Sequence, residues 1–235
     1  MQFHKICWWN LLSKEKIMII KIITSAIAVF IAIIAHEIAH GWVAYKLGDD
    51  TAKKHDRLSL NPIKHIDIFG TIILPILLFL SKSGFIFGWA KPVPVNYYNL
   101  QHRKRDIILV ASAGIIMNIL LALISAILLK ITLFIPNHII SGILAMFWLH
   151  MIFFNIVLAV FNLLPIPPLD GSKILLGWSE NPTVNKFLNS ERYGLSAIIF
   201  IVFIIPVILQ HFNINFNPIA DYLRYTSLTI ADWLI

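Results

Sequence analysis

Residues 35–40 read Ala35-His36-Glu37-Ile38-Ala39-His40 and lie near the end of a long apolar run, residues 17–45. Two imidazoles and a carboxylate are costly in hydrocarbon, so their presence in such a run predicts a functional site. Side chains at positions i and i+4 of a helix share one face, which lets His36 and His40 direct ring nitrogens at a common point. Glu37 projects about 100° away, within reach of a water held at that point. The spacing is typical of a catalytic zinc site with two imidazole ligands and a neighbouring general base.

The composition is that of a polytopic membrane protein. Of the 235 residues, 58% are hydrophobic and 13% are charged, and the mean hydropathy is +0.79. The formal net charge of +7 fits Lys and Arg concentrated in loops on one side of a membrane. We expect no nucleic-acid partner, because no basic stripe with interleaved aromatic residues is present. The single Cys7 excludes a disulfide within the chain, and the mixed polar and aromatic residues 1–16 do not form a cleavable signal peptide.

The apolar runs predict an all-α polytopic membrane protein with one membrane-embedded domain, residues 1–235. Residues 68–80 are too short an apolar run to cross comfortably, and they contain Pro75. Residues 84–98 have the pattern of short strands around Gly and Pro, so we expect a re-entrant or hairpin-like element over residues 68–98. The expected membrane spans are residues 17–47, 107–131, 139–164 and 193–209, followed by an interfacial tail, residues 217–235.

The third span ends in a proline-rich stretch, residues 162–171, which reads Asn-Leu-Leu-Pro-Ile-Pro-Pro-Leu-Asp-Gly. Prolines at this density cannot continue a helix. Irregular backbone at membrane depth is tolerated only where protein buries it or where it lines a wet cavity. The acidic side chain presented there, Asp170, is a candidate third ligand for a metal held by His36 and His40.

Membrane topology gives an internal test of that assignment. If Asp170 meets the metal, the number of crossings between His40 and Asp170 must be even. Two spans lie between them, so residues 68–80 must enter and return on one side. The side that then carries 13 Lys or Arg residues, against 6 on the other, holds the loops 46–67, 82–105 and 165–192. Because cytoplasmic loops are enriched in Lys and Arg, the metal site is predicted near the cytoplasmic face.

Motifs along most of the chain are similar to those of one family of membrane enzymes. Besides residues 36–40 and 162–171, they include Ser-Leu-Asn-Pro, His-Ile-Asp and Gly-Thr within residues 59–71, and Lys-Pro-Val-Pro-Val-Asn at residues 91–96. On these motifs the chain resembles the compact bacterial and archaeal members of the site-2 protease family, which are intramembrane zinc metalloproteases. The resemblance implies an integral protein of the cytoplasmic membrane of a prokaryote.

The resemblance also implies site residues and partners. One Zn2+ per chain would be bound by His36, His40 and Asp170, with Glu37 as the general base. Asn162, eight residues before Asp170, would correspond to the asparagine that helps to hold the substrate carbonyl or the oxyanion. The substrate would be a single-span membrane protein, cut within or near its transmembrane segment in the lipid bilayer. The hairpin-like element would present an edge to the unwound substrate.

The chain departs from the family pattern in two respects. Many members carry Gly-Pro in the span after the hairpin, whereas this chain has Gly114-Ile115-Ile116-Met117-Asn118. The neighbouring small residues still permit close helix packing, so we expect altered local bending without loss of chemistry. No stretch is long enough for a PDZ or CBS domain, which other branches of the family carry.

Other interpretations of these residues are open at the level of sequence. A membrane scaffold that holds zinc without cutting is one, although a scaffold has no use for an intramembrane Glu37. A membrane zinc peptidase of another family, with Glu180 or Glu191 as its third ligand, is a second. The remaining polar groups are expected to form hydrogen bonds, within loops for His55, His65 and Asp67, and between helices for Asn118, His150 and Asn155.

Overall fold

The computed structural model describes residues 13–73, 76–77, 80, 90–188, 190, 196, 200, 205–211 and 218–234. Within these residues it is helical and contains no strand, as the predicted all-α class requires. Three of the described helices are long and apolar enough to cross a membrane. They are α1 (Lys14–Lys46), α4 (Arg103–Thr132) and α5 (His138–Asn162), and they cover the first three expected spans.

Helix α1 has a defined start and a sharp end. The Ser13 side chain accepts a hydrogen bond from the Lys16 amide at the N-terminus. At the other end, Gly48 has a φ of +108°, a backbone conformation that glycine adopts without steric cost. The helix therefore ends at a sharp turn, and Asp49 lies next to the C-terminal end of α1.

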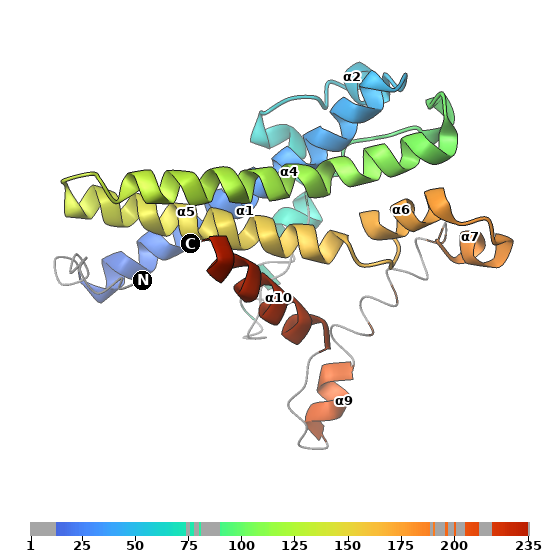
Figure 1. The fold of residues 1–235 in the computed structure, drawn as a ribbon. Helices are drawn as coiled ribbons and strands as arrows, with labels where there is room; N and C mark the ends of the chain where they lie inside the picture. Colours follow the sequence, from blue (N-terminus) through green and yellow to red (C-terminus); the bar gives the residue numbers. More distant parts are fainter. Residues whose placement is uncertain are drawn as a thin grey trace.

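The three long helices form one packed bundle. Figure 1 shows α4 and α5 side by side, with α1 crossing them. Ala28, Ala32 and Ala44 of α1 are completely buried, and such small side chains let helix backbones approach closely in a membrane. The Thr24 hydroxyl lies 3.0 Å from His150 Nδ1 on α5, an interhelical hydrogen bond of the kind expected for His150.

The contacts fix the relative directions of the helices. Toward the C-terminus of α1, Ala32 meets Asn118 of α4, which in turn meets Asn155 of α5. Thr24 contacts His150, and the later residue Ala32 lies at the level of the later residue Asn155, so α1 and α5 run in the same direction. Helix α4 runs in the opposite direction, because its Val110 contacts His40 and its later Asn118 contacts the earlier His36. The C-terminal ends of α1 and α5 therefore lie at the same end of the bundle, where the site assembles.

The segment between α1 and α4 starts and finishes at this end of the bundle. Its described helical turns are α2 (Thr51–Lys54), η3 (Pro62–His65), the π-helical η4 (Ile68–Ile73) and η5 (Tyr97–Asn99). Asp49 Oδ2, just after α1, accepts a hydrogen bond from the Asn96 amide at 2.7 Å, just before η5. The two ends of the segment are thus joined, which agrees with an even number of crossings between His40 and Asp170.

The expected hairpin is only partly described. Residues 81–89 lie outside the described part of the chain, so the re-entrant path stays a prediction. Residues 90–96 form no strand, in contrast to the strand pattern read from the sequence. Pro92 and Pro94 lack amide hydrogens, so alternate positions of this segment cannot donate to a ladder.

The described residues after the bundle include the helices α6 (Asp170–Trp178), α7 (Pro182–Leu188), α9 (Ile205–His211) and α10 (Pro218–Leu234). Most of the expected fourth span, residues 193–209, lies outside the described part, as does residue 217, the first of the expected interfacial tail. Helix α10 packs on α5, where Ala231 joins the apolar cluster around Leu129 and Ile152. An interfacial position for this tail stays a prediction.

Candidate metal centre

Three side-chain atoms from two separate helices converge at one end of the bundle. Nε2 of His36 and Nε2 of His40 are 3.0 Å apart, and each lies 3.1 Å from Oδ2 of Asp170. His36 and His40 come from one face of α1, as their spacing predicted, and Asp170 is the first residue of α6. All three residues are buried. The structure therefore brings together the three residues selected from the sequence.

The hydrogen-bond partners of the imidazoles fix which ring nitrogen carries the proton. His40 Nδ1 lies 2.7 Å from the Val110 carbonyl oxygen, which can only accept, so this nitrogen donates. Asn118 donates its amide to the Ala32 carbonyl at 3.2 Å, which leaves its oxygen facing His36 Nδ1 at 2.6 Å. His36 Nδ1 therefore donates as well. Both Nε2 atoms present a lone pair toward Asp170.

These tautomers place three hydrogen-bond acceptors against one another. Asp170 Oδ2 is buried and accepts no hydrogen bond. Its lone pair and those of the two Nε2 atoms therefore face one another away from solvent. Such an arrangement is repulsive unless a cation lies among the atoms. In a tetrahedral zinc site with ligand distances of about 2.0–2.1 Å, donor atoms are about 3.3 Å apart, close to the separations here. Two imidazoles and one carboxylate fit a catalytic zinc ion with its fourth position open.

Glycines allow the elements to approach this closely. A Cβ atom on Gly114 of α4 would lie 2.5 Å from both His36 Cε1 and His40 Nε2. A Cβ on Gly171 would collide with the carbonyl groups of Leu163 and Leu164 in the proline-rich turn. Only residues without a side chain fit at these two positions.

The carboxylate of Glu37 contacts the segment that precedes α4, residues 90–96. Its Oε2 accepts a hydrogen bond from the Val93 amide at 2.8 Å. The same segment is held in place by Arg57, whose Nη2 donates to the Lys91 carbonyl at 2.7 Å, and by Asp49. Burial raises the pKa of Asp49, but hydrogen bonds from Thr51, Asn96 and Asn99 outweigh this and hold the pKa below its ordinary value. A chain of contacts thus keeps Glu37 beside the histidines.

Lys173 is a neighbour of the site that the sequence analysis did not select. It lies one helical turn after Asp170, and its Nζ is 4.0 Å from Asp170 Oδ1 and 5.8 Å from the centre of the Tyr97 ring. Burial lowers the pKa of Lys173, but Tyr97 and Asp170 raise it by more, so the side chain is a cation at neutral pH. The i, i+3 spacing from Asp170 was the available signal.

The other candidate residues have separate positions. Asn162, the last residue of α5, donates its amide to the Leu158 carbonyl of its own helix at 3.0 Å, and its oxyanion role stays a prediction. Glu180 forms an exposed ion pair with Lys104 at 3.4 Å, away from the three converging atoms, and Glu191 lies outside the described residues. His65 bonds the Ser59 carbonyl and Asp67 the Gly70 amide, as expected of loop residues.

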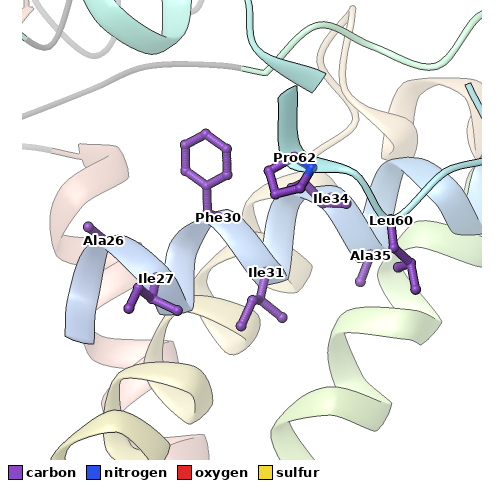
Figure 2. Close-up of a pocket in the computed structure, with 8 residues that line it drawn as sticks. All are labelled: Ala26, Ile27, Phe30, Ile31, Ile34, Ala35, Leu60 and Pro62. Carbon is purple, nitrogen blue, oxygen red and sulfur yellow. The ribbon is translucent and has the colours of Figure 1, made fainter. Parts of the chain in front are cut away.

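An apolar groove lies along one face of α1. Figure 2 shows its lining side chains, which come from this face of α1, from the loop before η3 and from Pro62 at the start of η3. Ala35, at one end of the groove, precedes His36 in the sequence, but at about 100° per residue the groove faces away from the side of α1 that carries His36 and His40. The residues that line the groove are Ala26, Ile27, Phe30, Ile31, Ile34, Ala35, Leu60 and Pro62.

A buried His-His-Asp donor set within a bundle of membrane-spanning helices defines a membrane-embedded metalloenzyme. The model of Peptidase family M50 matches residues 130–209. A Bacillus subtilis protein named "Putative zinc metalloprotease YwhC" is 40% identical over 205 residues, which cover 86% of this chain and 84% of the relative. The chain belongs to this family, the site-2 proteases, and it is a zinc metalloprotease integral to a membrane.

Two further relatives carry corresponding names. Rip2 of Mycolicibacterium smegmatis is 28% identical over 219 residues, covering 85% of this chain and 79% of the relative. MJ0611 of Methanocaldococcus jannaschii is 31% identical over 159 residues, covering 67% and 71%. No solved structure matches the chain.

Proposed function

We propose that the protein cleaves peptide bonds within or near transmembrane segments of membrane proteins, and that His36, His40 and Asp170 bind its zinc. The convergence of three bare acceptor atoms, buried at the end of a bundle of membrane-spanning helices, is the observation that supports this most. A site held by such helices is suited to a substrate that is itself in the bilayer. Regulated intramembrane proteolysis is the role that follows.

The chemistry is divided among a few residues. Zn2+, when bound, supplies a Lewis acid that polarises a peptide carbonyl and lowers the pKa of a nearby water. Glu37 accepts a proton from the attacking water and passes it to the nitrogen of the leaving amine. Asn162 rotates away from the Leu158 carbonyl and donates to the substrate carbonyl oxygen as negative charge develops there. Asn118 and the Val110 carbonyl keep both imidazoles in the tautomer that binds metal.

The substrate must expose a peptide bond to the metal centre. A transmembrane helix hides its carbonyl groups in internal hydrogen bonds, so part of it must unwind before water can attack. The apolar lining of the groove on α1 suits lipid-soluble side chains of such a segment, at a distance from the metal ligands. We place this site near the cytoplasmic face, because the loops at the same end of the bundle carry most of the Lys and Arg residues.

Purified wild type, Glu37→Gln and Asp170→Ala proteins test the assignment. Each would be analysed for bound zinc by elemental mass spectrometry and for cleavage of single-span reporter proteins in liposomes. We expect Glu37→Gln to keep zinc and to lose cleavage, and Asp170→Ala to lose both. Glu180→Gln, on the exposed surface, is the matched control and should behave as wild type. Wild-type cleavage by Glu37→Gln would remove Glu37 from the mechanism.

A further inference from the structure

We propose that Lys173 is a further catalytic residue, whose ammonium group donates to the scissile carbonyl oxygen as that oxygen becomes negatively charged. The inference rests on the proposed function, since it assigns a role within the same site. Lys173 reaches the site from α6, the helix that begins with Asp170.

The position of Lys173 follows from helix geometry. Residues at i and i+3 lie on one face, so Lys173 stands one turn from Asp170 on the side that faces the bundle. Its Nζ lies 4.0 Å from Asp170 Oδ1, whereas Oδ2 faces the imidazoles. The ammonium is therefore next to the three converging atoms without being one of them.

The separation from Asp170 leaves the ammonium available for a substrate. A distance of 4.0 Å is too long for a hydrogen bond, so the carboxylate does not occupy a donor of Lys173. The side chain of Lys173 is 31% exposed, compared with 7% for Asp170, and a bound peptide can reach it. A lysine carries three donors, so contact with Tyr97 does not exhaust them.

The ring of Tyr97 contacts the ammonium group of Lys173 and positions it next to the site. Its ring centre lies 5.8 Å from Nζ, a distance at which a cation is attracted to the face of an aromatic ring. Tyr97 belongs to η5, directly after the segment whose Val93 amide binds Glu37. The same stretch of chain thus positions the general base and the lysine, which places both where one peptide bond can meet them.

A merely structural role for Lys173 as a counter-charge to Asp170 is less consistent with these contacts. In the metal-loaded centre, the single carboxylate is already compensated by a divalent cation, so a second positive charge is not needed for it. Among the residues assigned so far, the charge that develops on the carbonyl oxygen during attack meets only a neutral donor, the Asn162 amide. A charged donor there is roughly twice as effective as a neutral amide such as that of Asn162.

Lys173→Met, Lys173→Arg and the control Lys104→Met test the proposal in the purified zinc-loaded protein. Lys104 is a matched control because it forms an exposed pair with Glu180 beside the same helix. We expect Lys173→Met to keep its zinc and its KM and to lose kcat by about 100- to 1000-fold, the usual effect of removing one oxyanion donor. Lys173→Arg should recover a large part of this loss, and Lys104→Met should match wild type.

A binding measurement gives a readout that does not depend on turnover. A phosphinic peptide carries a tetrahedral anionic group that imitates the developing charge, and its affinity can be measured by calorimetry. We expect Lys173→Met to weaken its binding by a factor similar to the loss of kcat, because transition-state interactions are lost from both. Zinc content and helical circular dichroism report whether each variant is folded.

Three results would overturn the proposal. Loss of zinc from folded Lys173→Met would show that the lysine has a structural role. A wild-type kcat and a wild-type affinity for the phosphinic peptide in Lys173→Met would show that the lysine has no role in catalysis. Loss of kcat in Lys173→Arg equal to that in Lys173→Met would exclude a positive charge as the cause. Failure of the proposed function itself would be seen separately, as cleavage that persists in Glu37→Gln.

Discussion

The side chain of Asn118 controls which nitrogen of His36 is presented to the metal. It is completely buried, and its amide group is oriented by the Ala32 carbonyl and by Asn155, whose own amide is bound to the Met151 carbonyl. The orientation of Asn118 is therefore set by two backbone carbonyls that can only accept. The burial of an amide side chain at position 118 thus has a physical reason, the fixing of an imidazole tautomer.

Replacing Asn118 tests this role. Asn118→Leu has a similar volume but no oxygen for His36 Nδ1, and we expect its zinc dissociation constant to rise about 10- to 100-fold. Asn118→Asp retains the oxygen and should bind zinc more tightly than Asn118→Leu. Competition with a fluorescent zinc chelator measures both values. Equal affinity of the leucine variant and wild type would show that the tautomer is set by other contacts.

Gly114 provides a second test at the level of one residue. Its added Cβ in Gly114→Ala would meet both imidazoles at 2.5 Å, so either the rings or α4 must move. We expect at least a tenfold loss of zinc affinity and a comparable loss of cleavage. Ile116→Ala, two residues along and 53% exposed, is the control and should keep both. Normal zinc binding by a folded Gly114→Ala protein would contradict the close approach.

The sequence predicted the three candidate ligands better than the contacts that hold them in place. Local spacing was sufficient to place His36 and His40 on one face, and the Lys and Arg distribution agreed with the even number of crossings that a shared site with Asp170 requires. The bond between Val93 and Glu37, and the approach of Tyr97 to Lys173, join residues more than 50 positions apart. Such contacts depend on how the segment before α4 folds back, which no local pattern encodes.

At the scale of elements, Asp49 joins the start and the finish of the segment between α1 and α4. It is completely buried and accepts hydrogen bonds from the amides of Thr51 and Asn96 and from the Asn99 side chain. Hydrogen bonds to a charged group each contribute about 1.5–3 kcal/mol. We expect Asp49→Asn to lower the free energy of unfolding by about 2–3 kcal/mol at neutral pH, because the amide cannot accept all of these bonds.

The stabilisation from Asp49 depends on pH in a definite direction. The pKa of Asp49 lies below the ordinary value of 3.8 in the folded protein, so its stabilising effect is complete above about pH 4. It is lost as the pH falls through the folded pKa, where the difference between wild type and Asp49→Asn should vanish. Thermal unfolding in detergent, measured from neutral pH down to below the folded pKa, gives the difference in stability between wild type and Asp49→Asn. Asp50→Asn, which removes a half-exposed carboxylate paired with Lys54, is the matched control and should change the free energy of unfolding by less than about 1 kcal/mol.

The long helices were predictable from the sequence, whereas the segment between them was not. Apolar runs of more than 20 residues have few alternatives to a spanning helix, and α1, α4 and α5 follow them closely. In residues 90–96, alternating valines suggested a strand, but Pro92 and Pro94 remove the donors that a strand needs. The segment is held instead by side chains, from Arg57, Glu37 and Asp49.

At the scale of the whole molecule, the direction of the three long helices sets the face at which the site lies. The C-terminal ends of α1 and α5 meet at one end of the bundle, and the start of α4 lies there too. On the expected topology the loops 46–67, 82–105 and 165–192 belong to this end, and they contain 13 of the 19 Lys and Arg residues. The charge pattern therefore predicts that this end of the bundle faces the cytoplasm.

Single cysteines would test this orientation in intact cells. Cys7→Ser removes the native thiol, and Tyr98→Cys and Phe134→Cys then place one thiol at each end of the bundle, at positions 82% and 84% exposed. A membrane-impermeant maleimide should label position 134 from outside intact cells and position 98 only in inverted vesicles. Helix direction requires opposite results for the two sites in either orientation of the protein. Labelling of both from one side would thus contradict the bundle itself, whereas an exchanged pattern would contradict only the charge rule.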